Sequence, residues 1–435
     1  MASMRVCLTM TVAAAVVIAV APPAAANGTT TTRISVSSAG NQSNDRSDDP
    51  AISADGRYVT FDSDATNLVP DDTNGVSDIF LRDRITGTTT RISVSTTGNQ
   101  ANGFSRASAI SADGRYIAYH SLATNLVPDD TNDEIDVFVW ERATDTTTRV
   151  SVSTNGYQAN HYSELPAISA DGRYITYHSL ATNLVPRDTN SAYDVFVRDQ
   201  VTGTTRRVSV STTGDQGNRD SFDPAISADG RYVSYTSSAT NLVPDDSNDA
   251  TDILVWDRTT GTTRRISVST SGDQGNDDSF TSVLSADGRH VSYASDASNL
   301  VPDDTNNATD IFVWNRTTGT TRRISVSTTG NQGGHFSRSP AISADGRYIA
   351  YHSLATNLVP DDTNDATDIF VRDRITGTTR RISVSTTGNQ ANHHSELPAI
   401  SADGRYIAYH SLATDLVPDD TNDATDIFVR NRGGY

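Results

Sequence analysis

The chain has 435 residues, 53 of them acidic and 34 basic, and a formal net charge of -19. It contains no lysine, and this acidic balance opposes binding to nucleic acid and to anionic lipid. Only 35% of the residues are hydrophobic, but they recur at fixed places along the chain, which is not typical of a disordered protein. We expect a folded protein that binds neutral or cationic partners and no nucleic acid.

The N-terminal segment has the features of a secretory signal peptide. Arg5 precedes an apolar run over residues 12–21, and residues 24–26 are small, as a cleavage site requires. The run is too short to span a membrane. The single cysteine, Cys7, precedes the run, where a lipid-anchor cysteine does not lie. We therefore predict a signal peptide over residues 1–26 and a secreted, extracellular protein with no lipid anchor, no membrane insertion and no disulfide.

A repeating unit of 58 residues fills the remainder, residues 27–435. Repeats that are all β and constant in length close most simply into a ring. The repeats are counted from the tripeptide Ala-Asp-Gly, whose aspartate we expect to cap a turn in which the glycine takes a positive φ. These aspartates are Asp55, Asp113, Asp171, Asp229, Asp287, Asp345 and Asp403.

Each repeat predicts four short strands. In the sixth repeat they are expected at residues 341–343, 348–352, 368–373 and 380–385, where β-branched and aromatic residues gather. Short turns follow the first and third strands, and long polar loops follow the second and fourth. Four strands joined in a meander form one blade. The sequence therefore predicts an all-β fold, a seven-bladed β-propeller with four-stranded antiparallel blades.

The two ends of the repeat array complement each other. The seventh repeat stops after its third strand, at residues 427–431, and an unaccompanied fourth strand is expected at residues 31–37. Pairing them completes the seventh blade and removes two exposed sheet edges. We expect the N-terminal strand to close the ring in this way, and we expect a monomer.

Three segments of the repeat carry a resemblance to a known family. In the sixth repeat they are Pro-Ala-Ile-Ser-Ala-Asp-Gly-Arg-Tyr-Ile-Ala-Tyr (340–351), Asp-Ile-Phe-Val-Arg-Asp (368–373) and Thr-Gly-Thr-Thr-Arg-Arg-Ile-Ser (376–383). This pattern resembles the TolB-like, WD40-like (PD40-type) propeller repeat, and it recurs over residues 31–432. The resemblance implies a propeller and a bias toward binding protein or carbohydrate. It departs from TolB itself, whose propeller usually has six blades.

The connections of the meander divide the predicted disc into two faces. Alternate connections lie at the same end of a blade, so the short turns share one face, the turn face, and the long loops share the other, the loop face. Binding residues tend to lie on loops that a rigid scaffold holds. We therefore expect the loop face to be the functional face.

The Asp-rich loop between the second and third strands offers oxygen ligands for a hard cation. Calcium binds about six to eight oxygens, and Asp-x-Asn opens a calcium loop of the EF-hand type. The spacing here is too short for that motif, no glutamate follows, and Arg187 replaces the first aspartate in the third repeat. We favour the alternative that Asp and Asn form turns that shape the loop. Calcium is the one cofactor that the sequence suggests. Its candidate ligands are Asp72, Asn74, Asp78, Asp362, Asn364 and Asp368.

One position at the end of the second strand is histidine in four of the seven repeats. A ring of imidazoles could hold a transition metal, but this strand is not the innermost of the blade. We favour a hydrogen bond between neighbouring blades. The seven residues are Asp62, His120, His178, Thr236, Ala294, His352 and His410.

The loop that joins one blade to the next differs most between repeats. Repeats two and three resemble repeats six and seven, and a seven-fold ring places blades three and seven almost opposite each other. We expect these loops to form a polar rim that contacts a ligand, since adjacent Ser, His and Glu on one extended loop rarely form a catalytic triad. The candidate rim residues are His161, Tyr162, Glu164, His393, His394, Glu396, Arg106 and Arg338.

Two function classes follow from these features. We favour a secreted binding or scaffold protein, not an enzyme, that holds a protein, peptide or glycan on its loop face. The alternative is a metal-assisted polysaccharide lyase or a glycoside hydrolase that uses the His and Glu residues of the rim. The His and Glu residues show no metal-ligand spacing, and we assign no catalytic residue.

Overall fold

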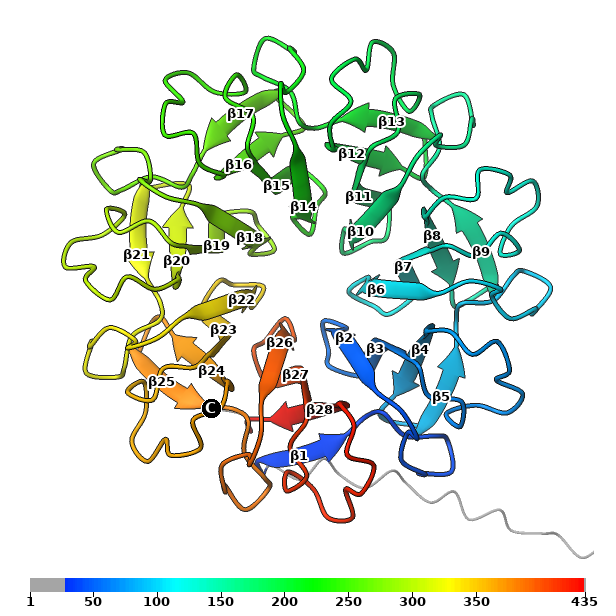
Figure 1. The fold of residues 1–435 in the computed structure, drawn as a ribbon, viewed down its shortest axis with the longest axis vertical. Helices are drawn as coiled ribbons and strands as arrows, with labels where there is room; N and C mark the ends of the chain where they lie inside the picture. The colour runs from blue at the N-terminus through cyan, green and yellow to red at the C-terminus, as the bar shows by residue number, and fades with distance from the viewer. Residues whose placement is uncertain (1–27, 434–435) are drawn as a thin grey trace, which may run out of the picture.

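The computed structural model of the protein describes residues 28–433. These residues form 28 strands and no helix, arranged as seven antiparallel sheets of four strands each. Figure 1 shows the sheets set radially around one axis. The predicted seven-bladed β-propeller is therefore confirmed. The signal peptide expected over residues 1–26 lies outside the described residues.

In six blades the four strands run in sequence order from the axis outward, and in the seventh β26, β27 and β28 are followed by β1 at the outer edge (Figure 1). The innermost strands are β2 (Ser47–Ile52), β6 (Ser105–Ile110), β10 (Ser163–Ile168), β14 (Ser221–Ile226), β18 (Ser279–Leu284), β22 (Ser337–Ile342) and β26 (Ser395–Ile400). The second strands are β3 (Tyr58–Ser63), β7 (Tyr116–Ser121), β11 (Tyr174–Ser179), β15 (Tyr232–Ser237), β19 (His290–Ser295), β23 (Tyr348–Ser353) and β27 (Tyr406–Ser411).

The two outer strands complete each blade. The third strands are β4 (Asp78–Asp83), β8 (Asp136–Glu141), β12 (Asp194–Asp199), β16 (Asp252–Asp257), β20 (Asp310–Asn315), β24 (Asp368–Asp373) and β28 (Asp426–Asn431). The fourth strands are β5 (Thr88–Arg91), β9 (Thr146–Arg149), β13 (Thr204–Arg207), β17 (Thr262–Arg265), β21 (Thr320–Arg323), β25 (Thr378–Arg381) and, in the seventh blade, β1 (Thr30–Arg33).

The hydrophobic core lies between neighbouring blades. Ile79 and Leu81 of β4 in the first blade pack against Ile117 and Tyr119 of β7 in the second. Equivalent clusters join the other neighbouring blades, because the second and third strands are buried on both of their faces. A modest apolar fraction is therefore enough to form a continuous core, because every repeat places its hydrophobic residues at the contact with the neighbouring blade.

The N-terminal strand closes the ring as predicted. β1 pairs antiparallel with β28, with Thr31 opposite Arg430 and Arg33 opposite Phe428. Ile34, which follows β1, is buried in the core between the seventh and first blades. The closure therefore joins residues from the two ends of the chain through both backbone pairing and burial.

The Ala-Asp-Gly turns lock neighbouring blades together on the turn face. Asp229 accepts hydrogen bonds from the hydroxyl of Ser227 and from the backbone N–H of Arg231. Gly230 has a φ of 68° and lies directly against the ring of Tyr174 in the preceding blade. The turn chemistry predicted from the sequence is therefore confirmed, and the glycine has a second role in packing.

Two strand boundaries differ from the prediction. The innermost strands begin four residues earlier than expected, at Ser337 in the sixth blade, because a β-bulge interrupts the pattern of alternation. The fourth strands end early, at Arg381, because the chain then turns at Ile382 and makes only one further bridge, between Val384 and Gln390. None of the described residues forms a helix that is long and apolar enough to cross a membrane.

Candidate functional site

The innermost strands place a β-bulge at the centre of the disc. In β10 the register with β11 shifts between Glu164 and Ala167, and Leu165 within the bulge has a φ of 48°. Left-handed backbone at a non-glycine residue is uncommon and is found mostly at special sites. The equivalent left-handed residues of the seven blades are Asp49, Ala107, Leu165, Asp223, Thr281, Ser339 and Leu397.

This bulge corrects the predicted location of four rim residues. Arg106, Glu164, Arg338 and Glu396 were expected in the loops between blades, but each is the second residue of an innermost strand. They therefore lie nearer the axis than predicted. Their side chains are held by strand pairing rather than by a loop.

Strand register brings the rim residues beside the histidines of the second strands. Glu164 is the Cα partner of His178, and the Glu164 Oε2 atom lies 3.7 Å from His178 Nε2. His120 of the preceding blade accepts a hydrogen bond from the N–H of Leu165 at 3.3 Å. We name the set that spans blades two to four the first arc; it consists of Arg106, His120, Glu164, His178 and Asp223.

The same arrangement recurs on the opposite side of the axis. His352 accepts a hydrogen bond from the N–H of Leu397 at 3.5 Å, and Glu396 Oε2 lies 3.9 Å from His410 Nε2. His410 Nδ1 lies 3.2 Å from an Asp48 oxygen of the first blade. We name this set the second arc; it consists of Arg338, His352, Glu396, His410 and Asp49. The expected hydrogen bond between blades is therefore confirmed for His120 and His352.

The arginine of each arc stacks on a phenylalanine. Arg106 lies 5.4 Å from the centre of the Phe104 ring, and Arg338 lies 5.3 Å from Phe336 and 5.8 Å from Phe280. A guanidinium above an aromatic face is favourable and keeps its charge available. Each arc thus offers a fixed cation, and Arg106 also acts on the carboxylates of Asp49 and Asp62 in the first blade.

The environments of the histidines separate their pKa values. Burial lowers the pKa of His120 and of His352 to about 4. Burial also lowers the pKa of His410, but the carboxylates of Asp48 and Glu396, with which it forms ion pairs, and the nearby charge of Asp49 have the larger effect. Together they raise the pKa of His410 to about 9. The seven-fold ring therefore contains a charged imidazole at the junction where it closes.

We predict that His410 is charged at neutral pH and that His120 and His352 are not. The ordinary pKa of His410 is 6.5, so its ion pair stabilises the fold fully below pH 6.5 and loses that contribution as the pH rises through about 9. NMR titration of the histidine ring protons measures each value. Asp48→Asn should lower the pKa of His410 and leave that of His120 unchanged, because His410 does not act on His120. A wild-type His410 that titrates near 6.5 contradicts the assignment.

The loop residues of the predicted rim have different surroundings. His161 contacts Tyr162 edge-on, with ring centres 4.6 Å apart, and its ring is exposed. His393 contacts His394, whose Nδ1 accepts a hydrogen bond from the N–H of Thr367. The loop histidines therefore remain at the rim, but His394 is committed to the neighbouring blade.

The serine between these histidines and glutamates is structural. Ser163 is fully buried, and its hydroxyl donates a hydrogen bond to the hydroxyl of Ser179 at 3.0 Å. Ser395 is buried in the same way against Ser411. These hydroxyls hold the first and second strands together, and they are enclosed within the blade.

A cavity of about 400 Å³ lies on the axis of the propeller. All seven bulges line it, chiefly through prolines such as Pro166 and Pro398 and through Leu165 and Leu397. Asp49 and Asp223 are the carboxylates of its wall. Sequence reasoning missed these two aspartates, because nothing in the repeat pattern indicates which residues adopt the bulge.

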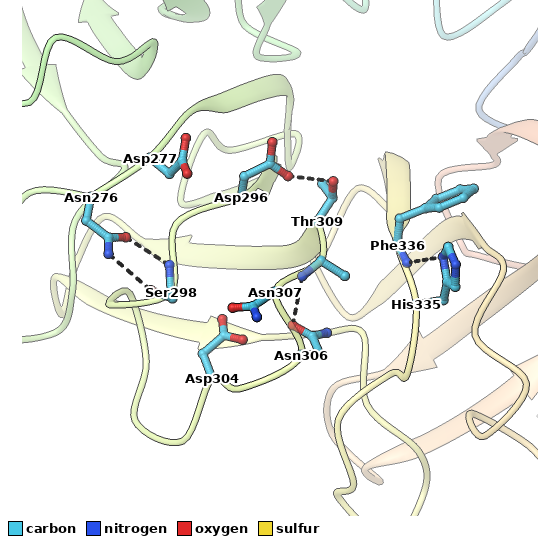
Figure 2. A pocket seen from close by; sticks show the side chains of 11 residues that line it. Asn276, Asp277, Asp296, Ser298, Asp304, Asn306, Asn307, Thr309, His335 and Phe336 are labelled. Atoms are coloured by element: carbon cyan, nitrogen blue, oxygen red, sulfur yellow. Dashed lines mark hydrogen bonds between the residues drawn. The ribbon is translucent and has the colours of Figure 1, made fainter.

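A second hollow of about 500 Å³ lies on the loop face between the fifth and sixth blades. Figure 2 shows Asp277, Asp296 and Asp304 coming from three separate segments around it, with His335 and Phe336 on the other side. Asp304 is paired with Arg323, whereas within residues 28–433 the Asp296 carboxylate accepts a hydrogen bond from the hydroxyl of Thr309 and forms no ion pair. This part of the loop face is therefore acidic.

The candidate calcium ligands lie in a network with arginine. Asp72 lies 3.1 Å and Asp78 3.7 Å from the same Arg91 nitrogen, and Asn74 donates a hydrogen bond to Asp78. Asp362 and Asp368 flank Arg381 in the same manner, and Asn364 donates to the carbonyl of Ala391. Within residues 28–433 no group of three His, Cys, Asp or Glu side chains is arranged to hold a metal ion. Calcium binding at these loops stays a prediction.

The fold and the central site together define a closed, seven-bladed β-propeller with a polar rim around an axial cavity. No family model matches the chain, and no curated protein matches it. Several propellers of known structure are similar to it in fold. The propeller domain of the trilobed protease from Pyrococcus furiosus, described as having an open velcro topology, is 10% identical with a TM-score of 0.56 over 90% of this chain and 96% of that chain.

Two further solved structures are similar. An oligogalacturonate lyase in complex with manganese is 13% identical, with a TM-score of 0.54 over 92% of each chain. TolB from Acinetobacter baumannii is 14% identical over 70% of this chain, with a TM-score of 0.41, and the chain spans 58% of the length of TolB. At these identities the similarities show the fold. The propeller fold that the resemblance to TolB-like repeats implied is confirmed by the seven four-stranded sheets and by the two propellers with the higher TM-scores.

Proposed function

We propose that this protein is a secreted, non-enzymatic binding protein that holds a protein or peptide on its loop face. The observation that carries the proposal is the composition of the rim. Next to the charged residues of the first arc, Tyr162 and Leu165 expose 37% and 40% of their surface. Exposed aromatic and aliphatic side chains beside arginine and carboxylate are typical of the anchors of protein interfaces.

Hydrogen bonds between the two long loops support a preformed binding surface. In the third blade the Asn160 side chain accepts from the N–H of Thr182, and Asn183 accepts from the N–H of Asn160 and donates to the carbonyl of Gln158. The same ladder recurs in the first blade. A surface that is already ordered loses little entropy when it binds a partner.

Charge indicates the kind of partner. The tips of the Asp-rich loops expose an aspartate in six of the seven blades, and the third blade has Arg187 instead. A partner with basic residues complements this face, and its affinity should fall as the ionic strength rises. The six aspartates are Asp71, Asp129, Asp245, Asp303, Asp361 and Asp419.

We predict that capture of such a partner depends on the rim. Immobilised protein is exposed to extracellular proteins and, separately, to glycans, and the captured molecules are compared between wild type and a Tyr162→Ala, Glu164→Ala, Glu396→Ala variant. Loss of one aromatic anchor and two carboxylates should weaken capture at least about 10-fold. Melting temperatures establish that both proteins are folded.

The repeats supply a matched control on the turn face. Ile85, Val201 and Ile375 are exposed there, and the equivalent position is threonine in the fourth and fifth repeats, at Thr259 and Thr317. Changing all three to threonine should leave capture unchanged. Two outcomes would refute a loop-face binding site: capture that is unchanged in the rim variant, or capture that is lost in the turn-face variant. If the protein captures glycans and no protein, the partner is a carbohydrate.

The two His–Glu pairs favour one alternative, a metal-assisted polysaccharide lyase or a glycoside hydrolase. The pairs are Glu164 with His178 and Glu396 with His410, and a manganese-bound oligogalacturonate lyase shares the fold. Elemental analysis of purified protein together with an assay on oligogalacturonate tests it. Stoichiometric manganese and cleavage of the substrate would replace the binding proposal.

A further inference from the structure

The axial cavity has the dimensions of a ligand site and a mostly apolar wall. Its volume of about 400 Å³ lies within the range of small-molecule pockets. Five prolines, two leucines, alanines and Val283 form most of the wall. Such a wall suits hydrocarbon, and it offers few groups that could solvate a charge. The prolines are Pro50, Pro166, Pro224, Pro340 and Pro398.

Two carboxylates interrupt this apolar wall. Asp49 and Asp223 occupy the same left-handed position in the first and fourth blades. Burial raises the pKa of each carboxylate, and nearby positive charges act to lower it. Among the described residues no group donates a hydrogen bond to either carboxylate. Both groups are therefore acceptors that the protein leaves open.

The neighbouring imidazoles do not neutralise these carboxylates. His410, the histidine nearest to Asp49, is already shared by Asp48 and Glu396. His178, which faces Asp223, is paired with Glu164. Two guanidinium groups also act on Asp49: Arg46, which is paired with Asp64, and Arg106, which makes no hydrogen bond to Asp49. Among the described residues no cation is bonded to either carboxylate, so an organic cation at each one supplies the partner that a carboxylate at an apolar surface lacks.

The positions of the two carboxylates define the shape of the ligand. The first and fourth blades are three steps apart in a ring of seven, so β2 and β14 face each other across the axis (Figure 1). One small cation cannot contact both carboxylates at opposite walls. A linear molecule with an ammonium group at each end and a methylene chain between them matches two distant acids and the prolines that separate them.

We propose that the axial cavity binds a linear diamine or polyamine, with one ammonium group on Asp49, the other on Asp223, and the methylene chain against the proline ring. This site adjoins the rim of the proposed function, with which it shares Asp49, Asp223 and Leu165, but it takes a small organic cation. It needs no partner protein, and its failure leaves the rim proposal untouched.

Calorimetric titration of the full chain with linear diamines of increasing length, and with spermidine, tests the site. Pentylamine and 1,5-pentanediol serve as the monoamine and the uncharged comparisons. We expect binding that is strongest at one chain length, because the two carboxylates are fixed. Asp49→Asn and Asp223→Asn should each weaken the best diamine about 10-fold, as expected for loss of a charge-assisted contact.

The repeats again supply the controls. Asparagine tolerates left-handed backbone as aspartate does, so these variants should keep the bulge, and their melting temperatures check this. Ser339→Ala changes the equivalent position in the sixth blade and should leave the affinity for the diamine unchanged. Alanine is accommodated at this position, since the second blade already has Ala107 there. No binding of any diamine at millimolar concentration, equal affinity for pentylamine, or unchanged affinity in the Asp49→Asn, Asp223→Asn double variant would overturn the proposal.

Discussion

Deletion of residues 27–38 is expected to destabilise the propeller by about 5 kcal/mol or more and to lower its melting temperature by about 5–10 °C. The deletion removes β1 and the buried Ile34, and it exposes the edge of β28. It also removes Ser35, whose hydroxyl donates a hydrogen bond to the fully buried Asp426. Asp426 keeps Gln42, Ser43 and Asn422 as donors, but loss of the Ser35 donor at a buried carboxylate adds to the cost of the lost apolar contact.

Point changes within the same strand separate closure from general effects of truncation. Ile34→Ala should cost about 3 kcal/mol, because it opens a cavity between the seventh and first blades. Thr32 is exposed in the same strand, and Thr32→Ala should change the melting temperature little. Calorimetry of the three variants measures these effects. A truncated protein that melts like the wild type would show that β1 does not hold the ring together.

Gly230→Ala is expected to cost about 3 kcal/mol or more. Gly230 has a φ of 68°, and an added Cβ would lie 2.1 Å from the ring of Tyr174. That ring cannot move aside easily, because it is buried and Arg258 stacks on it at 4.0 Å. The substitution therefore adds a steric clash between two blades to the strain of left-handed backbone.

Gly156→Ala is the matched control for this effect. Gly156 has a φ of 82°, but no atom lies within 4 Å of an added Cβ. Gly156→Ala should therefore lower the free energy of unfolding by only about 1 kcal/mol, through backbone strain. Chemical denaturation of both variants measures the difference, and equal losses would show that the contact with Tyr174 contributes nothing.

The architecture of the molecule could be predicted from the sequence because the repeat spacing is constant. The third strands, such as Asp368–Asp373, were placed correctly, since a run of β-branched and aromatic residues ends at clear turn signals. The first strands were not, because the segment Ser337–Pro340 lacks alternation and holds a bulge. Strand periodicity cannot reveal a bulge in which a serine or a leucine adopts a conformation that favours glycine.

The candidate site was predicted in its residue types and only partly in its position. The sequence pattern indicated that Arg106, Glu164, Arg338 and Glu396 differ from the rest of the array, but not that they lie on strands. The two arcs carried a signal that could have located them: histidine occupies the second-strand position only in those repeats that carry the Phe-Ser-Arg or Ser-Glu segment. The pairing of residues across blade boundaries depends on the radial arrangement, which one repeat by itself does not reveal.

Hydrogen–deuterium exchange of the protein with and without its captured partner tests the assignment of the loop face most directly. Protection is expected in the loops between second and third strands and between blades, such as residues 64–77 and 153–162. The Ala-Asp-Gly turns on the opposite face, such as residues 170–173, should exchange at the same rate in both samples. Protection confined to those turns, with unchanged exchange in the long loops, would contradict a binding site on the loop face.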